Sequence, residues 1–111
     1  MALVFRHGDV FLIQVRVVPT GLVRVPRDAS GRIILARGET TGHAHAIQDQ
    51  DAEMLWDPEL EERFLEVLRD SGVKLSHEEH DPLVVPRGVY RVFRQREYEP
   101  NEERQSRRVA D

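Results

Sequence analysis

The chain has 111 residues, of which 40% are hydrophobic and 32% are charged, and its formal net charge is −4. This size and composition predict one globular domain with a single modest core, and they exclude a second domain or a large enclosed cofactor cavity. The absence of cysteine excludes disulfides, thiolate nucleophiles and zinc–thiolate sites, so that any metal must be held by His, Asp or Glu.

Neither a signal peptide nor a membrane span is expected. The first nine residues reach charge and glycine too early for a signal peptide, and no segment approaches the roughly 20 apolar residues of a span. We therefore expect a cytoplasmic protein with no membrane partner. Residues 1–48 carry a charge balance of +3 and residues 49–66 a balance of −7. The acidic segment is typical of a solvated face, and without a long basic run nucleic acid is not an expected partner.

Three strands are predicted in the first half of the chain. Residues 10–18 are rich in β-branched side chains, with Gln14 and Arg16 alternating against apolar neighbours. A turn-rich connection then leads to a second apolar run at residues 32–36. The third run, residues 42–47, is flanked by turn residues and carries two histidines. These histidines are therefore expected on a strand or at its mouth.

Residues 57–72 fit two local structures. An Asp-Pro pair at the start of this segment is typical of a helix N-terminus, and apolar residues follow it at helical spacing. Residues 63–68 and 73–77, joined by a turn that contains glycine, also fit a hairpin. We expect a short helical turn near residues 57–62 that runs into this hairpin.

The last part of the domain reads as two strands and a tail. A Pro-x-Gly turn separates two apolar runs within residues 82–94 and predicts strand, turn and strand. Residues 96–111 contain only three apolar side chains and are expected to form a polar tail. Several short strands between Gly and Pro turns predict a mainly-β protein. The predicted fold over residues 1–95 is a small antiparallel barrel, similar to a double-stranded β-helix, with at most one short helix.

Four of the five histidines fall in two close pairs, His43 with His45 and His77 with His80. Residues i and i+2 of a strand point to the same face, so His43 and His45 can offer two imidazoles to one ion. The second pair converges only where the backbone bends, as it can before Pro82. Neutral imidazole is a preferred ligand of first-row transition metals. The four histidines therefore predict a site for a divalent metal such as Zn, Fe, Ni or Mn.

Acidic residues near the histidines are candidates for catalysis. Glu39 and Glu79 are close to the two pairs in sequence, and such a carboxylate would move a proton while the metal polarises a substrate oxygen or activates water. Four closed ligands would indicate a structural zinc, whereas three ligands with an open position would indicate catalysis. The sequence leaves both arrangements open.

Two segments resemble the short motifs of the cupin superfamily. They are residues 38–45, Gly-Glu-Thr-Thr-Gly-His-Ala-His, and residues 86–88, Pro-Arg-Gly. Gly38 lies one residue closer to the histidines than the family's glycine does, and Asp49 stands where the family has a glutamate. Arg91 occupies the place of the histidine ligand in the second motif.

With an arginine at that place, His77 or His80 would have to supply the remaining ligand. The resemblance implies a small double-stranded β-helix with one metal ion inside. Members of the superfamily with this fold include dioxygenases, isomerases and proteins that only bind a ligand.

Two other functions also fit the sequence. A non-enzymatic module would mediate assembly through its edge strands and polar tail, with the histidines in a structural role. Alternatively, metal-free histidines would act as general acid and base on a phosphodiester, with Arg37, Arg87 or Arg91 on the phosphate. The expected partners are a small-molecule substrate and further copies of the chain, because small barrels with an open edge strand often oligomerise.

Overall fold

A computed structural model gives the fold and describes residues 3–38 and 42–95. The predicted tail, residues 96–111, lies outside the described residues, as does Glu39. The regular elements of the described chain are strands, in this order: β1 (Val4–His7), β2 (Val10–Gln14), β3 (Val23–Arg24), β4 (Ile33–Arg37), β5 (Ala44–Ile47), β6 (Ala52–Asp57), β7 (Glu62–Val67), β8 (Val73–Ser76), β9 (Leu83–Val85) and β10 (Gly88–Arg94).

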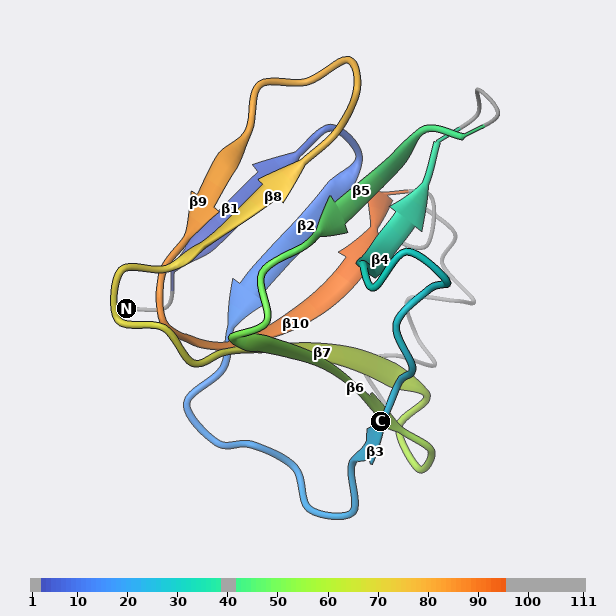
Figure 1. The fold of residues 1–111 in the computed structure, drawn as a ribbon. Coiled ribbons are helices and arrows are strands. Elements are labelled where there is room, and N and C mark those ends of the chain that lie inside the picture. Colours follow the sequence, from blue (N-terminus) through green and yellow to red (C-terminus); the bar gives the residue numbers. More distant parts are fainter. Residues whose placement is uncertain (1–2, 39–41, 96–111) are drawn as a thin grey trace.

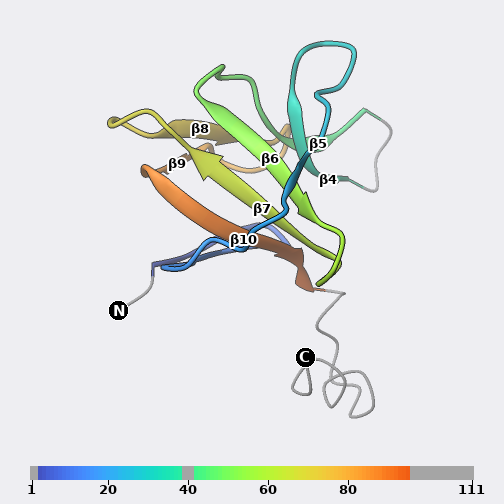
Figure 2. The same cartoon turned by 90° about the horizontal axis from the view of Figure 1, so that it is seen from below.

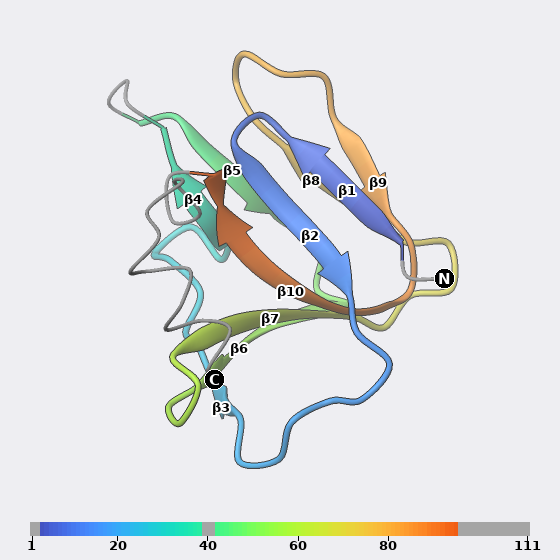
Figure 3. The ribbon, with the colours of Figure 1, turned by 180° about the vertical axis from the view of Figure 1, so that it is seen from behind.

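The strands form two antiparallel sheets. The larger sheet has the order β1-β2-β10-β7-β6-β3, and the smaller sheet has the order β4-β5-β8-β9. In Figure 1 the smaller sheet lies in front of β2 and β10, and the view from behind brings β1, β2 and β10 forward (Figure 3). Among the described residues no strand pairing joins the two sheets into a closed barrel. The mainly-β antiparallel fold is confirmed, with two open sheets in place of the barrel.

The core lies between the sheets and is built by strand alternation. Both sheets contribute fully buried apolar side chains, and Leu12, Leu35, Leu65 and Tyr90 are among the largest. Each such side chain contributes about 1.5–3 kcal/mol through removal of its surface from water. The Tyr90 hydroxyl donates a hydrogen bond of 2.8 Å to the Pro86 carbonyl, so its one polar atom is satisfied. Burial raises the pKa of Tyr90.

The first hairpin was not expected from the sequence. β1 pairs with β2 through His7 opposite Val10, which leaves Gly8 and Asp9 as a two-residue turn. Gly8 has φ +62°, a conformation that such turns require and that glycine adopts without steric cost. The predicted strand over residues 10–18 is correspondingly shorter and ends at Gln14.

The helical turn predicted near residues 57–62 is a hairpin turn instead. The Asp57 carboxylate accepts hydrogen bonds from the backbone N–H groups of Glu59 (2.9 Å) and Leu60 (3.1 Å), as the cap of a helix would. Glu61 then takes φ +54°, which is incompatible with a continuing right-handed helix. The chain turns back as β7, which runs between β6 and β10 in Figure 2.

The hairpin predicted between residues 63–68 and 73–77 is wrong. β7 pairs with β6 and β10 in the larger sheet, whereas β8 pairs with β5 and β9 in the smaller one. The loop between β7 and β8 contacts the connection between β5 and β6, because Arg69 pairs with Asp51 at 3.0 Å and with Asp49 at 3.3 Å. The glycine turn therefore carries the chain from one sheet to the other.

Candidate metal centre

All five histidines of the sequence meet at one end of the two sheets. Their ring centroids lie between 4.4 and 6.5 Å apart in a continuous set of contacts. The β1–β2 turn and the β8–β9 loop lie at this end in Figure 1. The histidines are His7 at the end of β1, His43 just before β5, His45 within β5, and His77 and His80 in the β8–β9 loop.

Strand alternation and one side-chain hydrogen bond bring β5 and the β8–β9 loop together. His45 and Ile47 are buried on the inner face of β5, whereas Ala44 lines a groove on the outer face. The carboxylate of Glu78 accepts a 2.9 Å hydrogen bond from the Ala44 backbone N–H, which ties the loop to the start of β5. This bond is the main reason that the pKa of Glu78 is lowered. The next residue before it, His77, is thereby held against His45, with their ring centroids 4.4 Å apart.

Two groups of three side chains could each hold a metal ion. Within each group, every residue brings one potential ligand atom to within 4.8 Å of those of the other two. The first consists of His45, His77 and His80, and the second of His43, His77 and Glu79. His77 belongs to both groups. The two histidines of the His-x-His motif thus fall into different groups. His45 is buried, His77 is partly buried and His80 is exposed, so the first group runs from the protein interior to solvent.

His7 orients His45 through a chain of hydrogen bonds. Nε2 of His7 lies 2.9 Å from the Asp81 carbonyl oxygen, which only accepts, so this nitrogen carries the proton. Burial lowers the pKa of His7, and Nδ1 of the neutral ring is then an acceptor. Nδ1 of His45, 2.9 Å away, must donate to it. Burial, followed by repulsion from His77 and His7, lowers the pKa of His45 to about 4. Its Nε2 therefore presents a lone pair.

The lone pair of His45 faces a carboxylate. Nε2 of His45 lies 3.6 Å from Oδ1 of Asp9, while Oδ2 of Asp9 accepts hydrogen bonds from Arg94 at 3.1 and 3.2 Å. Two acceptor atoms at this separation repel each other unless a cation or a proton lies between them. The arrangement is therefore one that a bound cation would stabilise.

Two glycines allow the backbone to close on the imidazoles. A Cβ at Gly8 would lie 2.8 Å from Cε1 of His45 and 2.9 Å from Nε2 of His80. A Cβ at Gly38 would lie 3.0 Å from Cβ of His43 and 3.3 Å from Nε2 of His77. The space beside His45 and His80 is open because residue 8 has no side chain.

The second group contains an unsatisfied buried nitrogen. Nδ1 of His43 is buried and has no hydrogen-bond partner within the described ranges. Among the described residues the nearest carboxylate oxygen is Oε2 of Glu79, 3.5 Å from this nitrogen and at ion-pair distance. Buried polar atoms without a partner are uncommon in folded proteins. An ion held between the His43 ring and the Glu79 carboxylate would give both a partner.

The other positions of the cupin resemblance lie away from this cluster. Asp49 bonds to the backbone N–H of Lys74 and to Arg69, on the opposite side of the smaller sheet. Arg91, at the place of the family's histidine ligand, pairs with Glu62 at 3.1 Å in the larger sheet. These residues stabilise the fold where the cupin pattern would place ligands.

Two of the three arginines considered for phosphate binding have structural partners as well, whereas Arg37 lies at the end of β4, opposite Ala44. Arg87 forms an ion pair with Asp70, and Arg91 forms the one with Glu62. The histidine cluster that the structure describes therefore lies beside carboxylates rather than beside these two guanidinium groups.

Sequence reasoning found four of the five clustered histidines and missed His7. A lone histidine has no neighbour at ligand spacing, and only the pairing of β1 with β2 places it beside His45. Asp9 was missed for the same reason. The Gly-Asp pair between apolar runs was the available signal, since this dipeptide predicts a hairpin that ends at His7.

A family model described as a domain of unknown function, DUF8820, matches residues 6–95 of the chain. Neither a curated protein nor a solved structure matches it. The match includes every histidine of the cluster and brings no link to the cupin superfamily. None of the described segments forms a helix of the length and apolar character needed to cross a membrane.

Proposed function

We propose that this chain, which belongs to the DUF8820 family, binds a divalent transition metal through His45, His77 and His80. The observation that carries the proposal is the convergence of all five histidines of the sequence at one end of the sheets. Chance would spread five histidines over the surface. Nitrogen ligands with carboxylates nearby, and no thiolates, suit Zn, Fe, Ni or Mn.

The hydrogen bonds around His45 support its role as a ligand. A metal-bound histidine ordinarily donates its second ring N–H to a fixed acceptor, which sets the tautomer and the ring orientation. His45 donates to His7, and His7 in turn donates to the Asp81 carbonyl. The free nitrogen of His45 then faces His77, His80 and the Asp9 carboxylate.

Metal binding at His77 requires a local rearrangement. Nδ1 of His77 accepts a 3.0 Å hydrogen bond from the backbone N–H of Glu79, so the neutral ring carries its proton on Nε2. Coordination through Nε2 would move this proton to Nδ1 and break the bond to Glu79. The β8–β9 loop is exposed at residues 78–82 and can absorb the change.

The same arrangement suits a metal-dependent enzyme. Three nitrogen ligands leave a coordination position open for water or substrate, which is typical of catalytic rather than structural sites. His80 is exposed, so that position faces solvent. The metal would polarise a substrate oxygen or activate water, and the Glu79 carboxylate, 65% exposed and next to His43, would move the proton.

The test is the metal content of the chain prepared without a histidine tag. We expect near-stoichiometric Zn, Fe, Ni or Mn by elemental mass spectrometry, either on purification or after reconstitution. His45→Ala and His80→Ala should lose the metal, whereas Gln50→Ala, at an exposed loop position, should keep it. Absence of metal in the wild-type chain after reconstitution with each of the four ions would overturn the proposal.

A further inference from the structure

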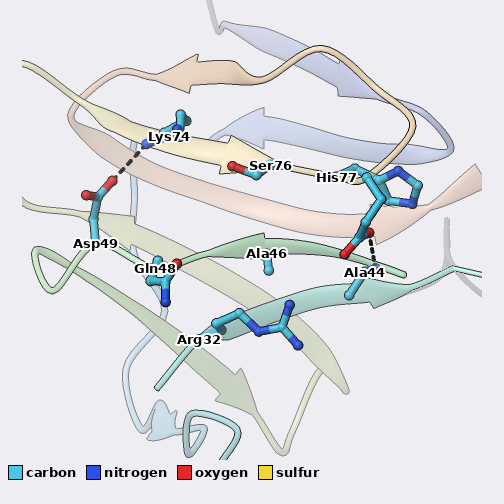
Figure 4. Close-up of a pocket in the computed structure, with 9 residues that line it drawn as sticks. Arg32, Ala44, Ala46, Gln48, Asp49, Lys74, Ser76 and His77 are labelled. Carbon is cyan, nitrogen blue, oxygen red and sulfur yellow. Dashed lines mark hydrogen bonds between the residues drawn. The ribbon is translucent and has the colours of Figure 1, made fainter. Parts of the chain in front are cut away.

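The outer face of the smaller sheet is hollowed into a groove of about 330 Å³. It lies over β5 and β8 and extends to Arg32, the residue before β4, on the face opposite to the core (Figure 4). Ligand pockets in proteins are generally roughly 300–1,000 Å³, so this groove suits a small molecule. His77 lines one end of the groove and also belongs to both groups of the histidine cluster.

Strand register explains why the face is hollow. Ala46 of β5 pairs with Ser76 of β8, which places a row of small side chains on the floor of the groove. Two residues from Ala46 and Ser76 along the chain, Gln48 follows the end of β5 and Lys74 lies in β8. Together with Arg32, which directly precedes β4, they are the long polar side chains that line the groove (Figure 4). The groove thus has a floor of small side chains, two basic side chains in its walls and His77 at one end.

The acidic residues of the groove already have partners. Asp49 accepts a 2.9 Å hydrogen bond from the backbone N–H of Lys74 and also pairs with Arg69. The Glu78 carboxylate accepts the 2.9 Å bond from the Ala44 backbone N–H. The Asp49 carboxylate shares Arg69 with Asp51, and the Glu78 carboxylate keeps its negative charge while its hydrogen bond fixes the start of β5. An anion in the groove would therefore lie against Arg32 and Lys74 and away from these oxygens.

The basic residues keep donors for a ligand. Arg32 directs Nε and Nη2 at one oxygen of Asp28, both at 3.1 Å, and its Nη1 group has no bond to protein within the described part of the chain. The ammonium of Lys74, the only lysine of the sequence, forms no ion pair with any described residue. Both side chains line the groove.

We propose that this groove binds the oxyanion end of a small molecule, a carboxylate or a phosphoryl group, between Arg32 and Lys74. A guanidinium and an ammonium on either side of β5 provide charge-assisted hydrogen bonds to such a group. The Ser76 hydroxyl and the Gln48 amide add polar contacts, and Ala46 leaves room for the ligand to lie along the floor.

The position of His77 gives this ligand a second role. Lys74 and His77 are three residues apart along β8 and its extension, roughly 10 Å for an extended chain. A ligand of five or six heavy atoms in length, held by its oxyanion, would bring its other end to the histidine cluster. The inference that this ligand is the substrate of the metal centre rests on the proposed function. The inference that the groove binds its oxyanion does not.

The experiment is a titration of the isotopically labelled full chain, free of metal, with succinate and separately with inorganic phosphate, followed by amide NMR. We expect saturable shifts at Arg32, Ala46, Gln48, Lys74 and Ser76. Lys74→Met should weaken the affinity about tenfold through loss of one charge-assisted contact. Saturation by succinate alone assigns a carboxylate, and saturation by phosphate alone assigns a phosphoryl group.

Two further variants separate the groove from its surroundings. Arg24→Met removes one exposed positive charge on the larger sheet and should leave the affinity unchanged. Ala46→Leu fills the floor without changing charge and should abolish the shifts. Equal weakening by Arg24→Met, or no saturable shift with either anion, would overturn the proposal.

The metal site and the groove can fail independently. His45→Ala lacks the buried nitrogen ligand of the proposed centre and should still bind the anion. Anion binding in a chain that takes up no metal would refute the metal centre alone, and metal uptake without anion binding would refute the groove alone.

Discussion

The two ends of the space between the sheets are filled by different chemistry. One end is packed with aliphatic side chains and Tyr90, all fully buried. The other end holds five imidazoles, of which His7 and His45 are as buried as the core. Both ends are built by the same strands, since Ile47 lies two residues beyond His45 in β5.

The two ends gain stability from burial in different ways. Aliphatic packing gains free energy simply by exclusion of water. Imidazoles lose hydration on burial, and this loss is offset only where each ring nitrogen finds a partner. His7 has two partners, whereas Nδ1 of His43 has no hydrogen bond among the described residues. The histidine end is therefore the part of the molecule whose stability should depend on pH and on a bound cation.

The largest effect is expected from a cavity in the aliphatic core. Leu35→Ala removes a fully buried side chain and should lower the free energy of unfolding by about 3 kcal/mol. Its metal content should stay unchanged, because Leu35 belongs to neither ligand group. Urea unfolding together with elemental analysis measures both. Loss of the metal in this variant would mean that the two ends are not separable.

Acid should destabilise the histidine end of the metal-free protein. The pKa of His45 is lowered from 6.5 to about 4, so the unfolded chain binds the proton more readily. The resulting stability is present above pH 6.5 and is lost as the pH falls toward 4, up to about 3 kcal/mol for this residue. Urea unfolding between pH 7 and pH 4 measures the slope, which should flatten in His45→Asn. An unchanged slope in that variant would assign the acid sensitivity to other groups.

The aliphatic end should lose stability at high pH rather than at low pH. Because burial raises the pKa of Tyr90, the unfolded chain releases this proton first. The associated stability is present below pH 10 and is lost as the pH rises above it. Tyr90→Phe should remove this loss, as followed by thermal unfolding from pH 9 to pH 11.

A methyl group at Gly8 should disable the histidine end alone. Its Cβ would lie 2.8 Å from the His45 ring and would displace that ligand. In the wild-type chain, a metal ion at one hundred times its Kd should stabilise the native state by about 2.7 kcal/mol. Gly8→Ala should lose this metal-dependent stabilisation in thermal unfolding. Gly31→Ala is the matched control, because Gly31 also has positive φ but nothing within 4 Å of its Cβ position. Equal loss in both variants would show that backbone strain, not the clash, is responsible.

The smallest effect is expected from His7. His7→Phe keeps an aromatic ring but removes the acceptor for Nδ1–H of His45, and loss of such a partner lowers metal affinity about 10-fold or more. Competition with a chromophoric chelator measures the affinity. Wild-type affinity in His7→Phe would mean that His45 is oriented by packing alone.

Local pattern predicted the β segments but not their partners. The Asp-Pro pair at residue 57 predicted a helix N-terminus, and Asp57 does accept two backbone hydrogen bonds as a helix cap would. Glu61 has positive φ, however, and the chain forms a hairpin in place of the helical turn. Likewise the runs at residues 63–68 and 73–77 contain β7 and β8, but these strands belong to different sheets, and Arg69 between them pairs with Asp49 and Asp51. Short apolar runs specify a strand, whereas sheet membership depends on contacts far apart in sequence.

The sequence by itself determined the mainly-β class, the exclusion of thiolate chemistry and the candidacy of four histidines, because composition and spacing are local properties. Only the tertiary structure decided that His7 and Asp9 join them, that His43 and His45 fall into different ligand groups, and that Arg32 and Lys74 share one groove. Each of these arrangements depends on strand register between distant segments. Register is set by the packing of a whole inner face, since a shift of one residue would turn every side chain to the other side of the sheet.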